Sequence, residues 1–517
     1  MAKFNESTKG KRTVTNHMGA KAYKHKPEFE LVSILLTSFM ENSYYESSAT
    51  TLNRLKEALG KVDAKFAAKA AVYARNEFGM RSVSHVLSVE LMKYISGKEW
   101  GKKFFESIVR RPDDMSEIIS YYFKDGKKSL PNSLKKGFAK AFEKFDRYQI
   151  AKYRGAKKTV SLIDVVNLVH PKATEKNEQA LKDLVNGTLK NVDTWESKLT
   201  KAGQDSTTKK EKEENKSKAW AELLNTNKMP YMALLRNLRN ILEQAPETLD
   251  KVCETLENKK MIKNSLVLPF RFLSAYGEVE KLKTAGMFEK EKTNINRVLE
   301  SIENAMKLSI DNLPILYGKT LILSDNSGSM RGDGGGNSKV SRFSNTKTSD
   351  IANLFAVLYW LKSDNTRVGL FGDRLVEPDL YRKAGIFKNF QIIDSAAKKC
   401  GYSTEQGIFK IFEEIVKNKT HVDTVVVFSD CQVGTSCNWY DLHGNHGSDF
   451  NKLFESYRKI NPDVRVYSVD LKGYGSDVFS DNAIKITGWS DKIFDIMKIM
   501  EQDKNALIKI INEYVDF

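Results

Sequence analysis

Long apolar runs, cysteine and proline are all scarce in this sequence of 517 residues. No apolar run reaches the roughly 18 residues that a membrane-spanning helix needs, so we expect no transmembrane segment and no membrane partner. The start of the chain is polar and lacks the apolar core of a secretory signal. The four cysteines are too few and too scattered for a disulfide framework. Together these absences favour a cytoplasmic protein with free thiols.

The positive charge of the sequence is confined to one part of it. The net charge is +17, and residues 1–310 hold 57 of the 83 Lys and Arg but only 39 of the 66 Asp and Glu. Residues 311–517 are therefore close to neutral. Such segregation indicates a polyanion-binding module joined to a neutral one. A lysine-rich, solvated surface without that role is the alternative.

The sequence pattern differs between residues 1–310 and residues 311–517, and this difference predicts at least two domains, as the length of the chain also does. Residues 1–310 read as serial amphipathic helices with apolar residues at three- and four-residue spacing, which favours a solenoid of stacked helix pairs. Examples are Phe29–Met40, Thr51–Leu59, Ala64–Phe78, Ser82–Ser96, Leu134–Tyr153 and Met232–Gln244.

Short β-branched runs alternate with helical segments in residues 311–517. Runs of this kind predict buried strands of a mostly parallel sheet with helices on both faces. They are Lys319–Ser324, Arg367–Phe371, Thr424–Ser429 and Arg465–Leu471. In such sheets, ligands bind at the carboxyl ends of the strands.

Two of these predicted strands end in an aspartate. Asp325 opens the pattern Asp-x-Ser-x-Ser with Ser327 and Ser329, and Asp430 follows the strand that ends at Ser429. A carboxylate and two hydroxyls on a tight loop can converge on one hard cation such as Mg²⁺. Alternatively, Asp325 caps a helix and the serines form a turn.

The string LSDNSGSM resembles the metal-ion-dependent adhesion site of von Willebrand A domains. That resemblance implies a Rossmann-like α/β fold and a site for Mg²⁺, or another divalent cation such as Mn²⁺, on Asp325, Ser327, Ser329, Thr404 and Asp430. Thr404 is assigned from Gly-Tyr-Ser-Thr-Glu (401–405), with Ser403 as the alternative. Glu405 departs from the aspartate of the family's loop.

Four longer strings resemble the TROVE module of the Ro autoantigen family, namely YARNEFGMRSVSH (73–85), LVHPK (168–172), MPYMALLRNLRNIL (229–242) and LPFRFLSAY (268–276). The resemblance implies a TROVE domain over 1–310, as an all-α, HEAT-like ring of helical repeats, closed by a von Willebrand A domain over 311–517. It implies a monomer that binds Y RNA-like small noncoding RNA and the single-stranded 3′ ends of misfolded RNA. An exoribonuclease is a further implied partner.

The same resemblance points to Lys152 and His170 as RNA-contacting residues, with Lys157 or Lys158 at the position of a contacting arginine. Basic side chains bind phosphate, while an imidazole stacks or forms hydrogen bonds with exposed bases. The alternatives are a solvated basic helix end and a histidine that satisfies a local backbone group. Arg75, Arg81, His85, Arg236 and Arg239 lie in matching strings too, but we interpret them as bracing between helices.

We therefore expect a non-catalytic RNA-binding protein for RNA quality control or for presenting RNA to a nuclease. A second hypothesis is a metal-dependent protein-adhesion module that works with an ATPase. A third is a nuclease that uses Mg²⁺ at Asp325 and Asp430, which the sparse set of carboxylates disfavours. No sequence motif joins a nucleophile to a base.

Overall fold

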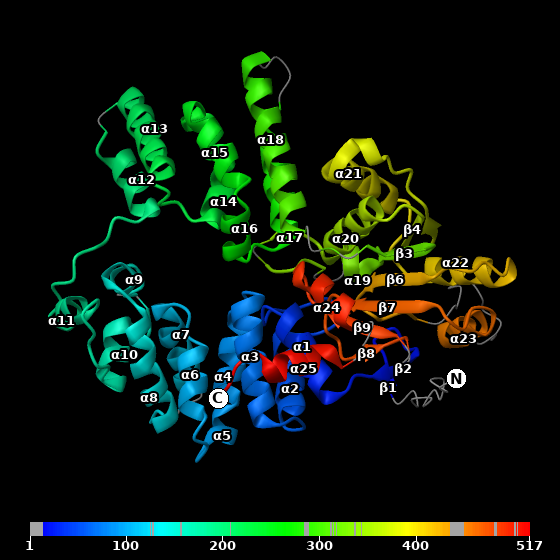
Figure 1. Ribbon diagram of the computed structural model, residues 1–517, viewed down its shortest axis with the longest axis horizontal. Helices are drawn as coiled ribbons and strands as arrows, with labels where there is room; N and C mark the ends of the chain where they lie inside the picture. Colours follow the sequence, from blue (N-terminus) through cyan, green and yellow to red (C-terminus); the bar gives the residue numbers. More distant parts are fainter. Residues whose placement is uncertain are drawn as a thin grey trace. The chain divides into compact units, whose positions relative to one another are not determined.

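Four apolar runs of the C-terminal part form the central strands of a sheet in the computed structural model of the protein (Figure 1). They are β3 (Thr320–Asp325), β4 (Thr366–Phe371), β6 (Thr424–Ser429) and β7 (Arg465–Asp470). The strand order is β5-β4-β3-β6-β7-β9. Every neighbouring pair is parallel except that β5 (Leu375–Val376) runs antiparallel to β4, and β9 (Ile484–Thr487) extends the parallel part. The predicted α/β sheet is confirmed as a mixed sheet.

The structure describes residues 14–124, 126, 129–155, 158–206, 208–283, 289–310, 313, 315–316, 318–334, 338–342, 344–434, 449–479, 483–500, 503 and 505–517.

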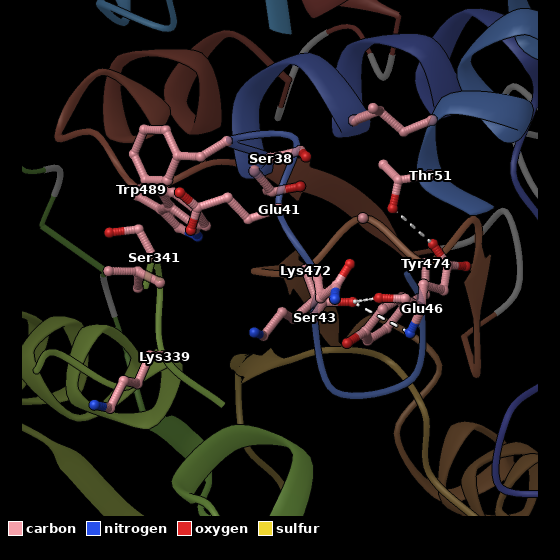
Figure 2. Close-up of a pocket in the computed structure, with 16 residues that line it drawn as sticks. Ser38, Glu41, Ser43, Glu46, Thr51, Lys339, Ser341, Lys472, Tyr474 and Trp489 are labelled. Atoms are coloured by element: carbon pink, nitrogen blue, oxygen red, sulfur yellow. Dashed lines mark hydrogen bonds between the residues drawn. The ribbon is translucent and has the colours of Figure 1, made fainter. Parts of the chain in front are cut away.

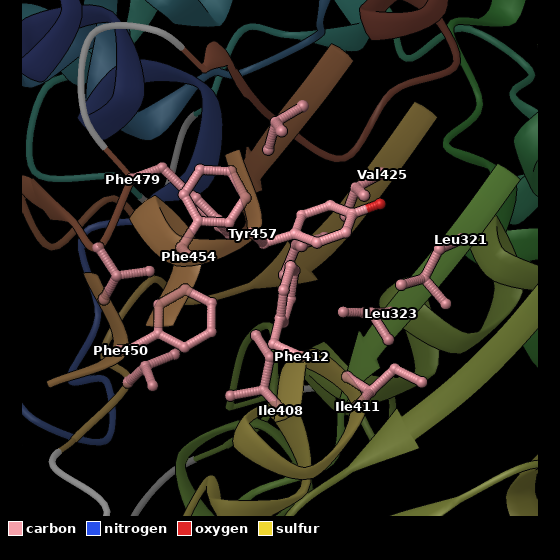
Figure 3. Packing of buried hydrophobic residues seen from close by; sticks show 14 of the residues in the cluster. Leu321, Leu323, Ile408, Ile411, Phe412, Val425, Phe450, Phe454, Tyr457 and Phe479 are labelled. Carbon is pink, nitrogen blue, oxygen red and sulfur yellow. The ribbon is translucent and has the colours of Figure 1, made fainter. Parts of the chain in front are cut away.

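Alternating side chains of the central strands build a separate core on each face of the sheet. Leu321 and Leu323 of β3 face α22 (Gln406–Lys417) and α23 (Phe450–Ile460), whose aromatic rings fill this layer (Figure 3). On the other face, Phe428 of β6 packs against Phe355 of α20 (Thr348–Lys362), with ring centroids 5.7 Å apart. Helices α21 (Gly385–Ala397) and α24 (Lys492–Met500) complete the set around the sheet. Successive side chains of a strand point to opposite faces of the sheet, so strands that are apolar throughout make both faces apolar.

The N-terminal segment belongs to the same unit as this sheet. Strand β2 (Lys21–Lys24) pairs antiparallel with β1 (Val14–Thr15) and with β8 (Ser476–Asp477), so that Tyr23 lies opposite Asp477. Helix α1 (Pro27–Thr37) follows, and its Ser33 donates a 2.9 Å hydrogen bond to Asp470 at the end of β7.

The chain divides into two compact units that are not consecutive in sequence. One unit contains residues 1–54, 267–277 and 302–508, and the other contains residues 55–266, 278–301 and 509–517. This grouping differs from the expected division at residue 310, because the first 54 residues lie with the α/β sheet. The predicted helical part thus supplies three segments to the α/β unit.

The second unit is helical, and its helices stack on near neighbours in sequence. Helix α4 packs on α3 and α7, α7 on α10, α6 on α8, and α12 on α13. Stacking of this kind is typical of helical repeats. The helices from α2 to α18, some of which extend into the first unit, are α2 (Ser48–Leu59), α3 (Ala64–Glu77), α4 (Ser82–Glu90), α5 (Met92–Ile95), α6 (Gly101–Ser107), α7 (Pro112–Lys124), α8 (Asn132–Ala141), α9 (Arg147–Lys152), α10 (Leu162–Val169), α11 (Glu178–Val185), α12 (Trp195–Gln204), α13 (Lys209–Asn225), α14 (Tyr231–Gln244), α15 (Leu249–Leu256), α16 (Lys259–Ser265), α17 (Pro269–Glu280) and α18 (Glu289–Ser309).

Local sequence signals start and orient these helices. The side chain of Asp63 accepts a hydrogen bond from the backbone of Phe66 at the start of α3, and Ser161 and Asp164 form a reciprocal capping box on α10. Such caps satisfy backbone N–H groups that have no partner within the helix. One apolar stripe of each amphipathic helix is then buried, as Leu234 and Leu238 of α14 are.

A buried carboxylate on α7 braces three helices of the second unit. Asp114 is fully buried and lies 2.9 Å from Arg75 of α3 and 2.8 Å from Arg81, which precedes α4. His85 Nε2 of α4 is 3.3 Å from the same carboxylate. Burial alone would raise the pKa of Asp114, but hydrogen bonding to His85 and the charge of Arg75 hold it well below its usual range. The expected bracing role is confirmed for Arg75, Arg81 and His85, but it is wrong for Arg236 and Arg239, which are exposed on α14.

Two further expectations concern thiols and membranes. The cysteines within the described residues, Cys253, Cys400 and Cys431, are buried free thiols, whereas Cys437 lies outside those residues. Across the described ranges, no helix is both long enough and apolar enough to cross a bilayer.

Candidate functional site

Asp325 ends β3 as a fully buried carboxylate held by two hydrogen bonds. The backbone N–H of Ser327 donates to Oδ1 at 2.9 Å, and the hydroxyl of Ser429 donates to Oδ2 at 2.6 Å. Ser429 ends β6, the strand beside β3. Parallel strands thus bring both polar ends to one edge of the sheet, as the sequence predicts.

The two predicted serine ligands lie in the turn directly after Asp325. The hydroxyl oxygens of Ser327 and Ser329 are 3.3 Å apart, and both side chains are buried. Ser329 sits in the short helix α19 (Gly328–Arg331). Gly328 donates its N–H to the carbonyl of Tyr402 at 2.9 Å, and a Cβ at Gly328 would lie 2.7 Å from that oxygen. Only glycine therefore lets this turn meet the 401–405 loop.

Thr404 lies on that second loop, which Asp373 holds in place. The backbone N–H and the hydroxyl of Thr404 both donate to Oδ1 of Asp373, at 2.6 and 2.8 Å. Gly401 has a φ of +76°, and a side chain there would clash with the same carboxylate. Ser403, the alternative to Thr404, is exposed. Sequence reasoning missed Asp373, although a carboxylate soon after a buried strand was an available signal.

Asp430 carries an oxygen that no group satisfies. It is 2% exposed, its Oδ1 accepts a 3.1 Å hydrogen bond from the N–H of Gln432, and Oδ2 is buried with no hydrogen-bond partner. Burial and the charge of Asp325 raise the pKa of Asp430 to about 7. Burying a carboxylate oxygen without a partner costs folding free energy, so this edge of the sheet suits a cation.

A third carboxylate and a tyrosine, both missed by sequence reasoning as site residues, face this edge. Glu405 is buried, and burial together with the charges of Asp325 and Asp430 raises its pKa well above the usual value. Tyr45 comes from the N-terminal segment and forms a hydrogen bond with Ser329. Burial raises the pKa of Tyr45, so its hydroxyl is neutral. No local pattern in the sequence could have placed Tyr45 here.

Lys472 is a buried cation beside the same carboxylates. Burial lowers the pKa of Lys472 to about 8, against the opposing effect of Asp430. It lines a cavity of about 30 Å³ with Tyr474 and Glu46 (Figure 2), which holds only about one or two water molecules. The lysine offsets part of the negative charge at this edge.

Hydroxyl oxygens are essential to any metal site here. Within the part of the chain that the structure describes, no group of three or more His, Cys, Asp or Glu side chains is arranged to hold a metal ion. A cation at this edge would therefore rely on Ser327 and Ser329 beside Asp325 and Asp430. Such a set of hard oxygens fits Mg²⁺ better than zinc.

The helical unit carries the second candidate site, a basic surface around Tyr153. Lys152 Nζ at the end of α9 is 5.7 Å from the centre of the Tyr153 ring. The guanidinium of Arg111 lies 4.6 Å from the same ring, with its side chain 40% exposed. Arg111, just before α7, was not among the predicted residues. A cation stacked on an exposed tyrosine is a platform that suits both phosphates and bases.

Lys158 lies next to acidic residues of α7. Its Nζ is 3.7 Å from Asp113 and 3.6 Å from Glu117, while its side chain remains 43% exposed. Its charge is therefore partly offset before any RNA binds. The neighbouring candidate Lys157 lies outside the described residues.

His170 occupies the C-cap of α10 with an exposed side chain and a left-handed backbone, φ 50° and ψ 65°. This conformation costs a non-glycine residue roughly 1 kcal/mol or more, so glycine would serve a purely structural C-cap better. The backbone N–H of His170 donates to Val166, and this bond does not require the imidazole. An exposed ring at a strained position supports a binding role more than a local structural one.

Comparison with known proteins assigns the family. Residues 32–219 and 193–320 match the TROVE domain, which together is more than half of the chain.

The chain belongs to the TROVE family.

Proteins of the TROVE family are RNA-binding ribonucleoproteins and are generally not enzymes. Among relatives of this TROVE chain are proteins named telomerase protein component 1, 26% identical in mouse and 23% identical in rat over 369 residues. These alignments cover 53% and 54% of this chain but only 14% of each relative. The crystal structure of the Deinococcus radiodurans Ro (Rsr) protein has the same fold, with a TM-score of 0.56 and 16% identity. That match covers 95% of this chain and 100% of the other.

Proposed function

We propose that this protein is a non-catalytic RNA-binding protein that takes Y RNA-like and misfolded small noncoding RNAs. The TROVE match over residues 32–320 carries the proposal, because that family consists of RNA-binding ribonucleoproteins. The basic excess of residues 1–310 supports it, since phosphate contacts supply most of the affinity of such proteins. RNA quality control, or a scaffold for RNA degradation by an exoribonuclease, is the corresponding cellular role.

In this proposal the surface of Lys152, Arg111 and Tyr153 contacts the RNA. Lys152 would bind phosphate, and the exposed part of the tyrosine would stack on an unpaired base. Arg111 and Lys158 would contribute less, because Arg111 already pairs with Asp113 at 2.6 Å and Lys158 lies beside Asp113 and Glu117. His170 would add a neutral contact at the C-terminus of α10.

The α/β unit is proposed to be a von Willebrand A domain with an adhesion-type metal site. Asp325, Ser327, Ser329, Thr404 and Asp430 would hold Mg²⁺ or Mn²⁺, either directly or through water. The unpartnered Oδ2 of Asp430 and the charge of Asp325, which raises the pKa of both Asp430 and Glu405, support a divalent cation here. A bound cation would supply charge neutralisation, while the residues themselves fix the approach of oxygen ligands.

The contact between Tyr45 and Ser329 disfavours a purely adhesive role for this site. An external carboxylate would need the space next to Ser329, where the chain's own Tyr45 already donates or accepts a hydrogen bond. The protein-adhesion alternative, with an ATPase as partner, would require residues 43–46 to move away.

The decisive experiment is purification under native conditions followed by sequencing of the bound RNA. Under the proposal, the protein carries small RNAs that are lost at high salt. Purification free of RNA, together with no affinity for structured small RNA in filter binding, would refute it.

A further inference from the structure

A cavity of about 400 Å³ lies in the α/β unit, away from the carboxylates at the end of β3. It is bounded by the start of α1, by Lys485 of β9 and by Met500, Asn505, Leu507 and Ile508. Its volume falls in the range of about 300–1,000 Å³ typical of small-molecule sites. Phe29, Met500 and Leu507 give it an apolar wall.

His25 is the polar centre of this cavity. It is 4% exposed, and both of its ring nitrogens are buried without a hydrogen-bond partner. Burial and the charges of Lys485 and Arg54 hold the pKa of His25 well below its usual value, so the ring is neutral. A neutral imidazole has one donor and one acceptor. Because two unmet polar atoms in the interior cost free energy, a ligand that places an acceptor at one ring nitrogen and a donor at the other would stabilise the site.

The mouth of the cavity is suited to an anion. Helix α1 has 11 residues and begins here, with Lys26 as an N-cap whose side chain makes no capping hydrogen bond and Pro27 in the first turn. The first N–H groups of a helix lack intrahelical partners and attract negative charge. Lys26 and Lys485 line the same cavity, and the carboxylate of Glu28 opposes them in part. Lys26, Lys485 and the helix start favour an anion at the mouth, and Lys485 also faces the buried carboxylate of Asp477.

We propose that this cavity binds a nucleoside monophosphate unit. The base packs against Phe29 and the apolar wall, one polar group of the base and one of the ribose each meet a ring nitrogen of His25, and the phosphate lies between Lys26, Lys485 and the start of α1. A free mononucleotide and the terminal nucleotide of an RNA present the same chemistry. The site lies in the α/β unit, so it does not depend on the proposed basic surface of the helical unit.

Titration calorimetry on the full chain tests the proposal with AMP, UMP, adenosine and inorganic phosphate as separate ligands. We expect the mononucleotides to bind more tightly than adenosine or phosphate. His25→Phe keeps the ring volume but removes both hydrogen bonds, so it should weaken AMP binding roughly tenfold or more. Lys485→Met should also weaken AMP and leave adenosine unaffected. Lys452→Met, an exposed lysine of α23, is the matched control and should change nothing.

Three results would overturn the proposal. They are no mononucleotide binding, phosphate alone binding as tightly as AMP, and equal AMP affinity in wild type and His25→Phe. Leu507→Trp fills the cavity from its apolar wall and serves as a second variant in case His25→Phe misfolds. It should no longer bind AMP, and its melting temperature should equal or exceed that of wild type. Retained AMP binding in Leu507→Trp would equally sink the site.

Competition distinguishes the two sources of the nucleotide. If a short single-stranded RNA displaces AMP from wild type, the ligand is the end of an RNA strand. The same RNA should have no such effect in His25→Phe, because that variant has already lost the site. An RNA that leaves bound AMP in place identifies the free mononucleotide. Filter binding of structured RNA to Lys152 and Arg111 variants tests the proposed function separately, so either proposal can fail alone.

Discussion

The hydroxyl of Ser429 donates a 2.6 Å hydrogen bond to Oδ2 of Asp325 and so joins the ends of β6 and β3. This bond orients the carboxylate whose other oxygen faces the Ser327 turn. Hydrogen-bond partners of this kind commonly change metal affinity by about 10- to 100-fold when they are removed. Ser429 therefore provides a graded test of the proposed metal site beside its proposed ligands.

Mg²⁺ should bind the full chain, and Asp325→Ala should abolish the calorimetric isotherm. Ser429→Ala should weaken binding by about tenfold, because only the orientation of the carboxylate is lost. Asp364→Ala, at a fully exposed aspartate, is the control. An unchanged isotherm in Asp325→Ala would show that the cation binds elsewhere. The full chain is required because Tyr45 and α1 belong to the same unit as the site.

RNA affinity should fall steeply with salt, and the lysines near Tyr153 should account for part of the slope. Each phosphate contact contributes about −0.7 to the slope for single strands. Replacing Lys152, Lys157 and Lys158 by alanine should flatten the slope by at most about two, and by less if Asp113 and Glu117 already offset Lys158.

Matched variants distinguish this surface from general charge in a filter-binding salt series. Lys182→Ala, on the exposed face of α11, should leave the slope nearly unchanged. His170→Ala should weaken structured RNA without altering the slope, because a neutral imidazole displaces no counterions. Asp325→Ala should bind RNA almost normally. Loss of RNA binding in Asp325→Ala, with normal binding by the lysine variants, would mean that the metal site is the RNA site.

Asp114→Asn should destabilise the helical unit by about 3–5 kcal/mol, because Arg75 would remain buried without its anion, while Arg81 keeps Asp113 and Glu117 as partners. The pKa of Asp114 is depressed in the fold, so its stabilisation is present above about pH 4 and is lost as the pH falls below that value. Denaturant unfolding followed by helical circular dichroism measures both effects. Glu278→Gln, an exposed control that pairs with Lys281, should change stability by less than about 1 kcal/mol. If Asp114→Asn unfolds at the same denaturant concentration as wild type, that result would contradict the bracing role.

His25 should make the α/β unit sensitive to a milder acid range. Its pKa is lowered in the fold, so below about pH 6.5 the unfolded chain binds a proton that the folded chain refuses. His25 therefore lowers the free energy of unfolding as the pH falls from about 6.5, whereas Asp430, whose pKa is raised to about 7, acts in the opposite direction. In His25→Phe this part of the decline should disappear, while the loss below about pH 4 remains. Thermal melting between these two pH values, compared with wild type, provides the check, and an identical pH profile in the variant would count against it.

The strands could be predicted closely because their apolar runs are continuous and short. Thr424–Ser429 is β6 to the residue, β4 and β7 differ from the predicted ranges by one residue at one end, and β3 is shifted by one residue at both ends. The predicted helix Leu134–Tyr153 is instead α8, a 3-10 turn and α9, because Asp146 caps a new helix. The period of a single apolar stripe does not reveal such an interruption.

The surroundings of the site were harder to predict because they depend on contacts between distant parts of the chain. Asp325 and Asp430 each follow an apolar run, so their shared edge follows from local sequence. Tyr45 approaches Ser329 only because residues near the start pair with the C-terminal part, as the amide of Asn16 does with the carbonyl of Val433. No periodicity or motif reports such a pairing. The ring closure implied by the family resemblance and the residue set of the metal site stay predictions.

The pairing of β2 with β8 sets an order of events during synthesis of the protein. Residues 21–24 leave the ribosome before residues 55–266 and 278–301 of the helical unit, whereas their partners at Ser476–Asp477 are made only after those residues. Helices with neighbouring partners can fold as they emerge, whereas distant strand pairing waits and is slow. The N-terminal segment must therefore stay unpaired and protected until the sheet is complete. Ribosome-associated chaperones would find an exposed strand and the apolar face of α1 during that interval.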